Sequence, residues 1–300
     1  MTRKIAMALR SRPTIEGAGV HLKRVFGFQQ APDLDPFLLL DDFSSDDPEK
    51  YLAGFPWHPH RGIETITYVL EGHVEHGDSM GNRGVITEGD VQWMTAGSGI
   101  IHQEMPKGRD DGLLRGFQLW ANLPARDKMM EPRYRDIKAG SIPVVNLDSG
   151  GTVRVICGRF EGVEGPARDI VIEPEYLDVS LPSGAVFARK VPLGHTVFAY
   201  VTEGAAHFDR DHDPFAYDVQ GENYFDLERD CLIRSGTLVK YADGDGIEIS
   251  ASPDGARFLL VSGRPLGEPV AWQGPIVMNT REELRIAFEE YRDGTFLKHA

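Results

Sequence analysis

The chain has 300 residues, and its 32 basic against 46 acidic residues give a formal net charge of −14. Such an excess of negative charge would repel nucleic acid and anionic membranes, which favours a small molecule as the partner. Two cysteines exclude a disulfide framework, and without a signal peptide or any run near the roughly 20 apolar residues of a membrane span, we expect a cytoplasmic protein.

The first half reads as short β-strands separated by turns. Residues 20–26 alternate in polarity, residues 65–70 are strongly β-prone, and Glu71-Gly72 closes that run with a turn. Short strands follow, and Gly97-Ser98-Gly99 lets the backbone bend before the next one. The 33 Gly and 19 Pro are spread along the chain, which is typical of an all-β sandwich or barrel.

The second half repeats this pattern after a charged stretch at residues 124–143 that resembles a linker. A second series of β-prone runs extends from residue 153 to residue 261. The chain then ends in one clear helix, predicted over residues 280–293, because Thr280 and Glu283 form a capping box. Its apolar stripe consists of Leu284, Phe288 and Tyr291.

The strongest chemical signal lies in His58-Pro59-His60 and in His102-Gln103-Glu104, which begins 42 residues after His60. Side chains i and i+2 of a strand point to one face, and Pro59 favours an extended conformation at His58. Three imidazoles and a carboxylate suit Fe, Mn, Co, Ni, Cu or Zn better than Mg or Ca. A single histidine is more often satisfied by hydrogen bonds, but this compound pattern favours a metal.

Residues near these stretches are candidates for outer positions. If the run from His58 stays extended, Glu64 shares the face of the histidines, either as a fifth ligand or, as we favour, as an acceptor that orients an imidazole. Several apolar residues are most simply core, yet their nearness in sequence to the ligands makes them candidate pocket walls. They are Phe55, Trp57, Trp93 and Met94.

The two halves look related, because Tyr-Val-Leu-Glu-Gly at residues 68–72 returns as Tyr-Val-Thr-Glu-Gly at residues 200–204. The same offset of 132 residues places Lys190 and Pro192 where the first half has His58 and His60. We therefore expect a metal site in the first half and a related barrel without a metal site in the second half. The predicted domains are 1–140, a metal-binding barrel, and 141–300, a barrel without a metal site that also carries the terminal helix.

Three stretches together resemble the pirin family of the cupin superfamily. They are FPWHPHRGIET at residues 55–65, GDVQWMTAGSGIIHQEMP at residues 89–106 and GPIVMNT at residues 274–280. The resemblance implies a tandem double-barrel cupin, or bicupin, with one divalent metal, usually iron and hence Fe(II). It also implies that the metal ligands match His58, His60, His102 and Glu104. Glu64 would then lie outside the set of ligands.

Bacterial pirins are linked to quercetin 2,3-dioxygenase activity, whereas eukaryotic relatives are known as iron-dependent nuclear co-regulators of transcription. The leading hypothesis is a dioxygenase that cleaves a flavonol such as quercetin with O2 and releases CO, with Glu104 as the catalytic base. The alternative is a non-enzymatic regulator that binds a protein partner according to its metal or redox state. A purely structural metal is disfavoured, because structural zinc sites are usually closed and rich in thiolates.

Overall fold

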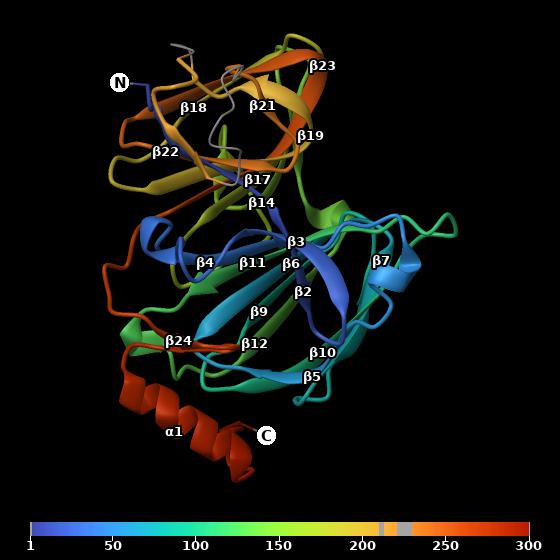
Figure 1. Cartoon of the computed structure of the whole chain (residues 1–300), viewed down its shortest axis with the longest axis vertical. Helices are drawn as coiled ribbons and strands as arrows, with labels where there is room; N and C mark the ends of the chain where they lie inside the picture. The colour runs from blue at the N-terminus through green and yellow to red at the C-terminus, as the bar shows by residue number, and fades with distance from the viewer. Residues whose placement is uncertain (1, 210–212, 221–229, 300) are drawn as a thin grey trace. The chain divides into compact units, whose positions relative to one another are not determined.

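The computed structural model describes residues 2–209, 213–220 and 230–299, which fold mainly into β-strands (Figure 1). They form two compact units. We call Pro13–Ala139 with Leu266–Ala300 the histidine unit, and Met1–Arg12 with Gly140–Pro265 the second unit. The predicted all-β fold with one C-terminal helix is confirmed. Within the described ranges, no helix has the length and apolar character needed to cross a membrane.

Two large sheets build the histidine unit. The seven-stranded sheet has the order β12 (Arg133–Ile137), β9 (Val91–Thr95), β6 (Ile63–Glu71), β11 (Arg115–Asn122), β4 (Phe37–Asp42), β3 (Val20–Phe26) and β2 (Arg12–Glu16). The four-stranded sheet has the order β5 (Phe55–His60), β10 (Ile100–Lys107), β7 (His73–Asp78) and β8 (Arg83–Ile86). Single-turn 3-10 helices lie in the connections at Ala31–Asp33, Pro48–Lys50 and Ala125–Asp127.

The two sheets share one interior. Thr67 on β6 and Gln118 on β11 both donate hydrogen bonds to the carboxylate of Glu104 on β10. The side chains of the two sheets therefore meet in this interior. The residues predicted to form the metal site lie on the strands that enclose it.

The histidine unit is completed by the last part of the chain. The hairpin of β24 (Ala271–Gln273) and β25 (Ile276–Met278) leads into α1 (Arg281–Arg292), which is red in Figure 1. The predicted capping box is present, because Thr280 Oγ1 accepts a hydrogen bond from the Glu283 backbone and the Glu283 carboxylate accepts one from the Thr280 backbone. The prediction placed this helix in the second domain, whereas in the structure α1 packs on β24 and β25 within the histidine unit. The domain limits 1–140 and 141–300 stay predictions.

We expect Thr280→Ala to lower the free energy of unfolding by about 1 kcal/mol, because it leaves the Glu283 amide in the first turn of α1 without its acceptor. Urea denaturation and amide exchange in that turn measure the effect. Glu282→Gln is the control, since the Glu282 carboxylate bonds Arg285 at the surface, where such pairs contribute little. Equal stability of Thr280→Ala and the wild type would contradict the assigned cap.

The second unit is built on a ten-stranded sheet. Its main path runs through β13 (Val144–Asn146), β14 (Thr152–Cys157), β17 (Glu175–Leu181), β23 (Gly246–Gly263), β19 (Thr196–His207), β22 (Thr237–Tyr241), β1 (Ile5–Arg10) and β20 (Asp218–Gln220). Off this path, β18 (Val186–Lys190) pairs with β23 and β21 (Ile233–Arg234) pairs with β19. A small hairpin joins β15 (Arg159–Phe160) to β16 (Val163–Glu164), and a 3-10 turn lies at Ala139–Ser141.

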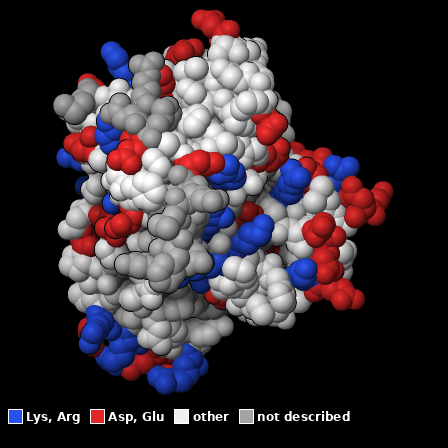
Figure 2. Space-filling view, turned by 45° about the horizontal axis from the view of Figure 1, so that its top comes forward, with Lys and Arg blue, Asp and Glu red and all other residues white. Residues whose placement is uncertain are grey.

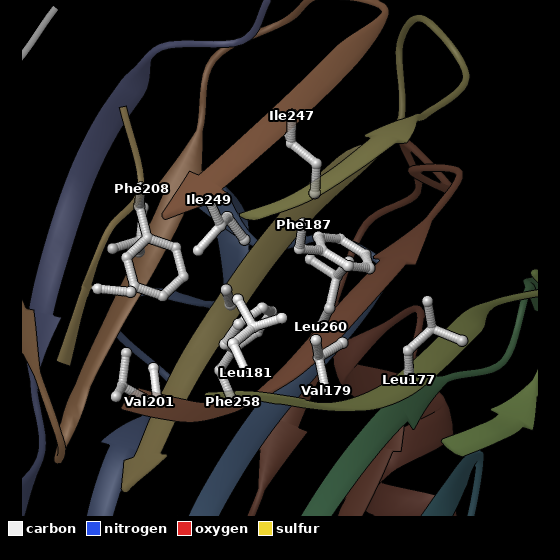
Figure 3. Packing of buried hydrophobic residues seen from close by; sticks show 14 of the residues in the cluster. Leu177, Val179, Leu181, Phe187, Val201, Phe208, Ile247, Ile249, Phe258 and Leu260 are labelled. Atoms are coloured by element: carbon white, nitrogen blue, oxygen red, sulfur yellow. The ribbon is translucent and has the colours of Figure 1, made fainter. Parts of the chain in front are cut away.

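Apolar side chains fill the interior of the second unit, where residues of β17, β18, β19 and β23 point toward one another (Figure 3). The ring of Phe187 stacks on Phe160 with centroids 5.8 Å apart and meets Phe258 edge-on at 6.0 Å. Lys190 and Pro192, at the positions offset from the histidines, are exposed. Among the described residues of this unit, no three His, Cys, Asp or Glu side chains come close enough to hold a metal.

Charged side chains of both signs occur in several separate places on the face shown in Figure 2. On this face, Lys and Arg are interspersed with Asp and Glu rather than joined into one basic surface. The residues that line the functional site therefore set its polarity.

Candidate metal centre

Two neighbouring strands bring the three histidines together. β5 pairs antiparallel with β10 so that His58 lies opposite His102, and His60 lies opposite Ile100. Alternation along each strand gives His58 and His60 one face of β5, and gives His102 and Glu104 one face of β10. The ligand atoms of the three histidines lie within 4.8 Å of one another.

The three imidazole rings are packed against each other, and two of them are shielded from water. Ring centroids are separated by 4.8 Å for His58 and His60, 4.4 Å for His58 and His102, and 5.0 Å for His60 and His102. His60 and His102 are each 1% exposed, and His58 is half-buried. Burying two polar rings against a third is costly unless their ring nitrogens share a polar partner.

Backbone carbonyls fix which ring nitrogens are free. His58 Nδ1 lies 2.8 Å from the Pro56 carbonyl oxygen, and His60 Nδ1 lies 3.0 Å from that of Pro275. Because a carbonyl only accepts, both Nδ1 atoms must donate, and in the neutral rings both Nε2 atoms then carry lone pairs. These two Nε2 atoms face each other at 3.1 Å. Two facing lone pairs repel unless they share a proton or a metal ion.

His102 also has the environment of a metal ligand. Both of its ring nitrogens are buried, and neither has a hydrogen-bond partner among the residues that the structure describes. Burial, followed by the nearby His60 and His58, lowers the pKa of His102 well below its ordinary value. Burial and His58 do the same to the pKa of His60. Neutral imidazole is the ligating form, so these three residues fit a divalent metal.

Glu104 lies close to the histidines but outside the set whose ligand atoms converge. Its Oε1 accepts a hydrogen bond of 2.9 Å from Thr67 Oγ1, and its Oε2 accepts one of 2.8 Å from Gln118 Nε2. These hydrogen bonds hold the carboxylate in place. Glu104 is also buried, with 4% of its surface exposed. Its assignment as the fourth ligand stays a prediction.

Glu64 does not lie beside the imidazoles, which corrects its predicted outer role. Thr67, three residues later on β6, reaches Glu104, so alternation along the strand turns Glu64 to the opposite face. There the Glu64 carboxylate accepts a hydrogen bond of 2.6 Å from Thr95 Oγ1, and burial raises its pKa. The predicted continuous extended run from His58 fails at Gly62, whose φ of 77° turns the chain between β5 and β6.

A cavity of about 640 Å³ opens beside His58, His60 and Glu104. Of the predicted walls, Phe55 lines it, but Trp57, Trp93 and Met94 do not. The reasons are that Trp57 is 48% exposed, Trp93 shares the face of Glu64, and Met94 packs in an apolar cluster. The aromatic walls that sequence reasoning missed are Phe28, Trp120 and Trp272.

These three aromatic side chains form a continuous wall of the cavity. Trp120 meets His60 edge-on at 5.0 Å and lies 5.9 Å from Trp272, which in turn lies 5.6 Å from the exposed Phe28. Trp272 follows His60 by more than 200 residues, so no local pattern could have linked them. The wall leads from the surface to the ring of His60.

The polar side of the cavity is dominated by acids. Arg24 is engaged by both oxygens of Asp41, at 2.9 and 2.8 Å, and by Glu16 at 2.9 Å. All three residues line the cavity together with Glu104. Because the single arginine is matched by two carboxylates, the cavity disfavours an anionic occupant and accepts hydroxyl donors.

Known proteins resemble the chain over almost its full length. The Pirin family matches residues 19–121, and the family described as Pirin C-terminal cupin domain matches residues 176–297. A pirin-like protein of Caulobacter vibrioides is 44% identical, with 98% of this chain and 99% of that protein covered. Human pirin is 37% identical, with 97% and 93% covered.

One solved structure extends this similarity to three dimensions. The crystal structure of the Acinetobacter baumannii protein named quercetin 2,3-dioxygenase superposes with a TM-score of 0.84 at 31% identity, and the match covers 99% of each chain. The double cupin fold implied by the strand pattern and the motifs is thereby confirmed. By its sequence over nearly every residue and by its fold, the chain belongs to the pirin family.

Proposed function

We propose that this pirin is a metal-dependent dioxygenase that cleaves a flavonol such as quercetin with O2 and releases CO. The observation that carries the proposal is a cluster of three imidazoles with converging ligand atoms, two of them fully buried, that opens onto an aromatic-walled cavity. The name of the related Acinetobacter protein supports the same substrate class. We further propose Fe(II) as the metal, with Mn, Co, Ni, Cu and Zn as the other ions that this donor set suits.

The cavity matches a flat, uncharged, hydroxylated substrate. A volume of about 640 Å³ lies within the range of small-molecule sites and accommodates a three-ring molecule. Trp120, Trp272 and Phe28 offer ring faces and edges for stacking. Asp41 and Glu16 offer acceptors for phenolic hydroxyl groups.

Glu104 is the base in this proposal. When bound, a divalent metal at the three histidines supplies a Lewis acid for the enolate oxygen and a template for O2. Glu104 accepts the proton of the flavonol hydroxyl, while Thr67 and Gln118 hold its two oxygens in place. Gln118 is itself oriented by Trp120, whose Nε1 donates a hydrogen bond of 3.0 Å to Gln118 Oε1.

The direct test measures the stoichiometry of the proposed reaction. Metal-free protein is reloaded with Fe(II) under argon, and in parallel with each of the other ions, and is then mixed with quercetin and O2. Loss of the flavonol band, O2 uptake and CO release should proceed in a ratio of 1:1:1. Flavonol loss without CO, or at the same rate in metal-free protein, would contradict the proposal. A metal-loaded protein without turnover would favour the regulatory alternative, in which a partner binds according to metal oxidation state.

Trp272→Ala should raise the KM for the flavonol about tenfold and leave kcat within about threefold, because a stacking wall binds ground and transition states alike. Steady-state CO release over a range of flavonol concentrations separates the two constants. Trp57→Ala is the matched control, since Trp57 is exposed and does not line the cavity. An unchanged KM in Trp272→Ala would exclude this wall from the binding site.

A further inference from the structure

The corner of the chain that follows the ligand His60 is contacted by residues 274–298, which we call the C-terminal segment. The Pro275 carbonyl accepts the hydrogen bond from His60 Nδ1. The next two residues continue along the same corner, because Ile276 forms a parallel bridge with Arg61 and the Val277 backbone donates to the Arg61 carbonyl at 3.1 Å. One ligand ring thus takes its orientation from backbone that lies 215 residues away in sequence.

Arg61 ties the same corner to the end of the chain. Its side chain is 2% exposed, and its guanidinium lies over the Phe296 ring at 4.2 Å. One terminal nitrogen donates to the Phe296 carbonyl at 2.7 Å, and the other lies 2.8 Å from the Glu290 carboxylate on α1. A buried arginine is costly without partners, and the proposed reaction makes no use of this one.

Lys128 forms a third connection between this corner and the C-terminal segment. Its ammonium donates to the carbonyls of Gly62 and Val277, at 2.9 and 3.1 Å, and to Asn122 Oδ1 at 2.7 Å. Burial lowers the pKa of Lys128 to about 8. At Gly62, a Cβ atom would lie 2.0 Å from the Val277 carbonyl oxygen, so only glycine permits this close approach.

We propose that Arg61 and the C-terminal segment are positioning elements of the metal centre, so that docking of the segment and binding of a metal strengthen each other. The segment supplies the carbonyl that orients His60, and Arg61 holds the segment against the ligand strand. Loss of such an outer partner typically weakens metal affinity 10- to 100-fold. The coupling is reciprocal, so metal must also tighten the segment. This inference rests on metal binding by the three histidines and not on flavonol turnover.

The first test is a Co(II) titration followed by visible absorption. Arg61→Met should bind Co(II) at least tenfold more weakly than the wild type, with a changed d–d spectrum because the His60 ring is released. Arg3→Met is the matched control. Arg3 is an equally buried arginine of the second unit, where it donates to the carbonyls of His195, Ala242 and Pro192. Wild-type affinity and spectrum in Arg61→Met would overturn the proposal.

A second measurement needs no variant and covers the case in which Arg61→Met fails to fold. Amide exchange of Val277 in the wild type is compared with and without saturating Co(II), beside Val155 of the second unit, whose amide donates to Pro143. We expect Co(II) to slow exchange at Val277 at least tenfold more than at Val155. Equal slowing at both amides would overturn the coupling, and so would a wild type that binds no Co(II). Protection at Val277 without flavonol turnover would support the coupling and reject only the dioxygenase.

Discussion

His102→Ala is expected to abolish stoichiometric metal binding and, with it, flavonol cleavage. His102 is the one histidine of the cluster whose two ring nitrogens both lack a hydrogen-bond partner among the described residues, so we propose a metal ion as its partner. Removing it leaves two imidazoles, and the affinity should fall by more than the roughly 100-fold that loss of an outer partner costs. Elemental analysis after dialysis and a Co(II) titration measure the loss.

The control for this prediction is His207→Ala. His207 lies in the second unit, where its Nδ1 interacts with the Cys231 carbonyl, so its loss removes an imidazole without touching the centre. His207→Ala should keep one metal ion per chain. A folded His102→Ala protein with a full equivalent of metal would remove the three-histidine centre from consideration.

Glu104→Gln is expected to lower kcat for the flavonol by about 100- to 10,000-fold, which is the usual contribution of a positioned general base. The amide keeps the size of the side chain and an oxygen that Thr67 can reach, but it has no charge with which to take a proton. Single-turnover loss of the flavonol band and CO release give the rate, and elemental analysis gives the metal content.

The same variant separates the two roles proposed for Glu104. Full metal content with slow turnover would identify it as a base, whereas a parallel loss of metal would identify it as a required fourth ligand. Glu75→Gln is the control, because Glu75 lies on neighbouring β7 and forms an exposed pair with Lys107. Wild-type kcat in Glu104→Gln would rule out the base.

The sequence predicted what depends on short spacing. His58 and His60, like His102 and Glu104, differ by two residues, and both pairs lie on strands as expected. The helix over residues 280–293 was equally local, since its capping box involves only Thr280 and Glu283. The family motifs extended this reasoning to the double cupin fold.

The sequence failed where one residue changes the phase of a strand or where distant segments meet. Glu64 was placed with the histidines by counting through Gly62, yet the positive φ of that glycine resets the alternation. The Trp272 wall and the Pro275 carbonyl arrive from the far end of the chain, and α1 packs on the hairpin that carries them. Such pairings depend on tertiary packing and leave no periodic trace in either segment.

The division of the chain between its two units has a consequence for biosynthesis. The histidine unit contains both Pro13–Ala139 and Leu266–Ala300, with the whole of the second unit's main segment inserted between them. During translation, the two sheets of the histidine unit are made early, but the hairpin that carries Trp272 and Pro275 is made only after the whole of Gly140–Pro265. By the coupling proposed above, a nascent chain that ends before Pro275 should bind the metal more weakly than a chain that includes the hairpin.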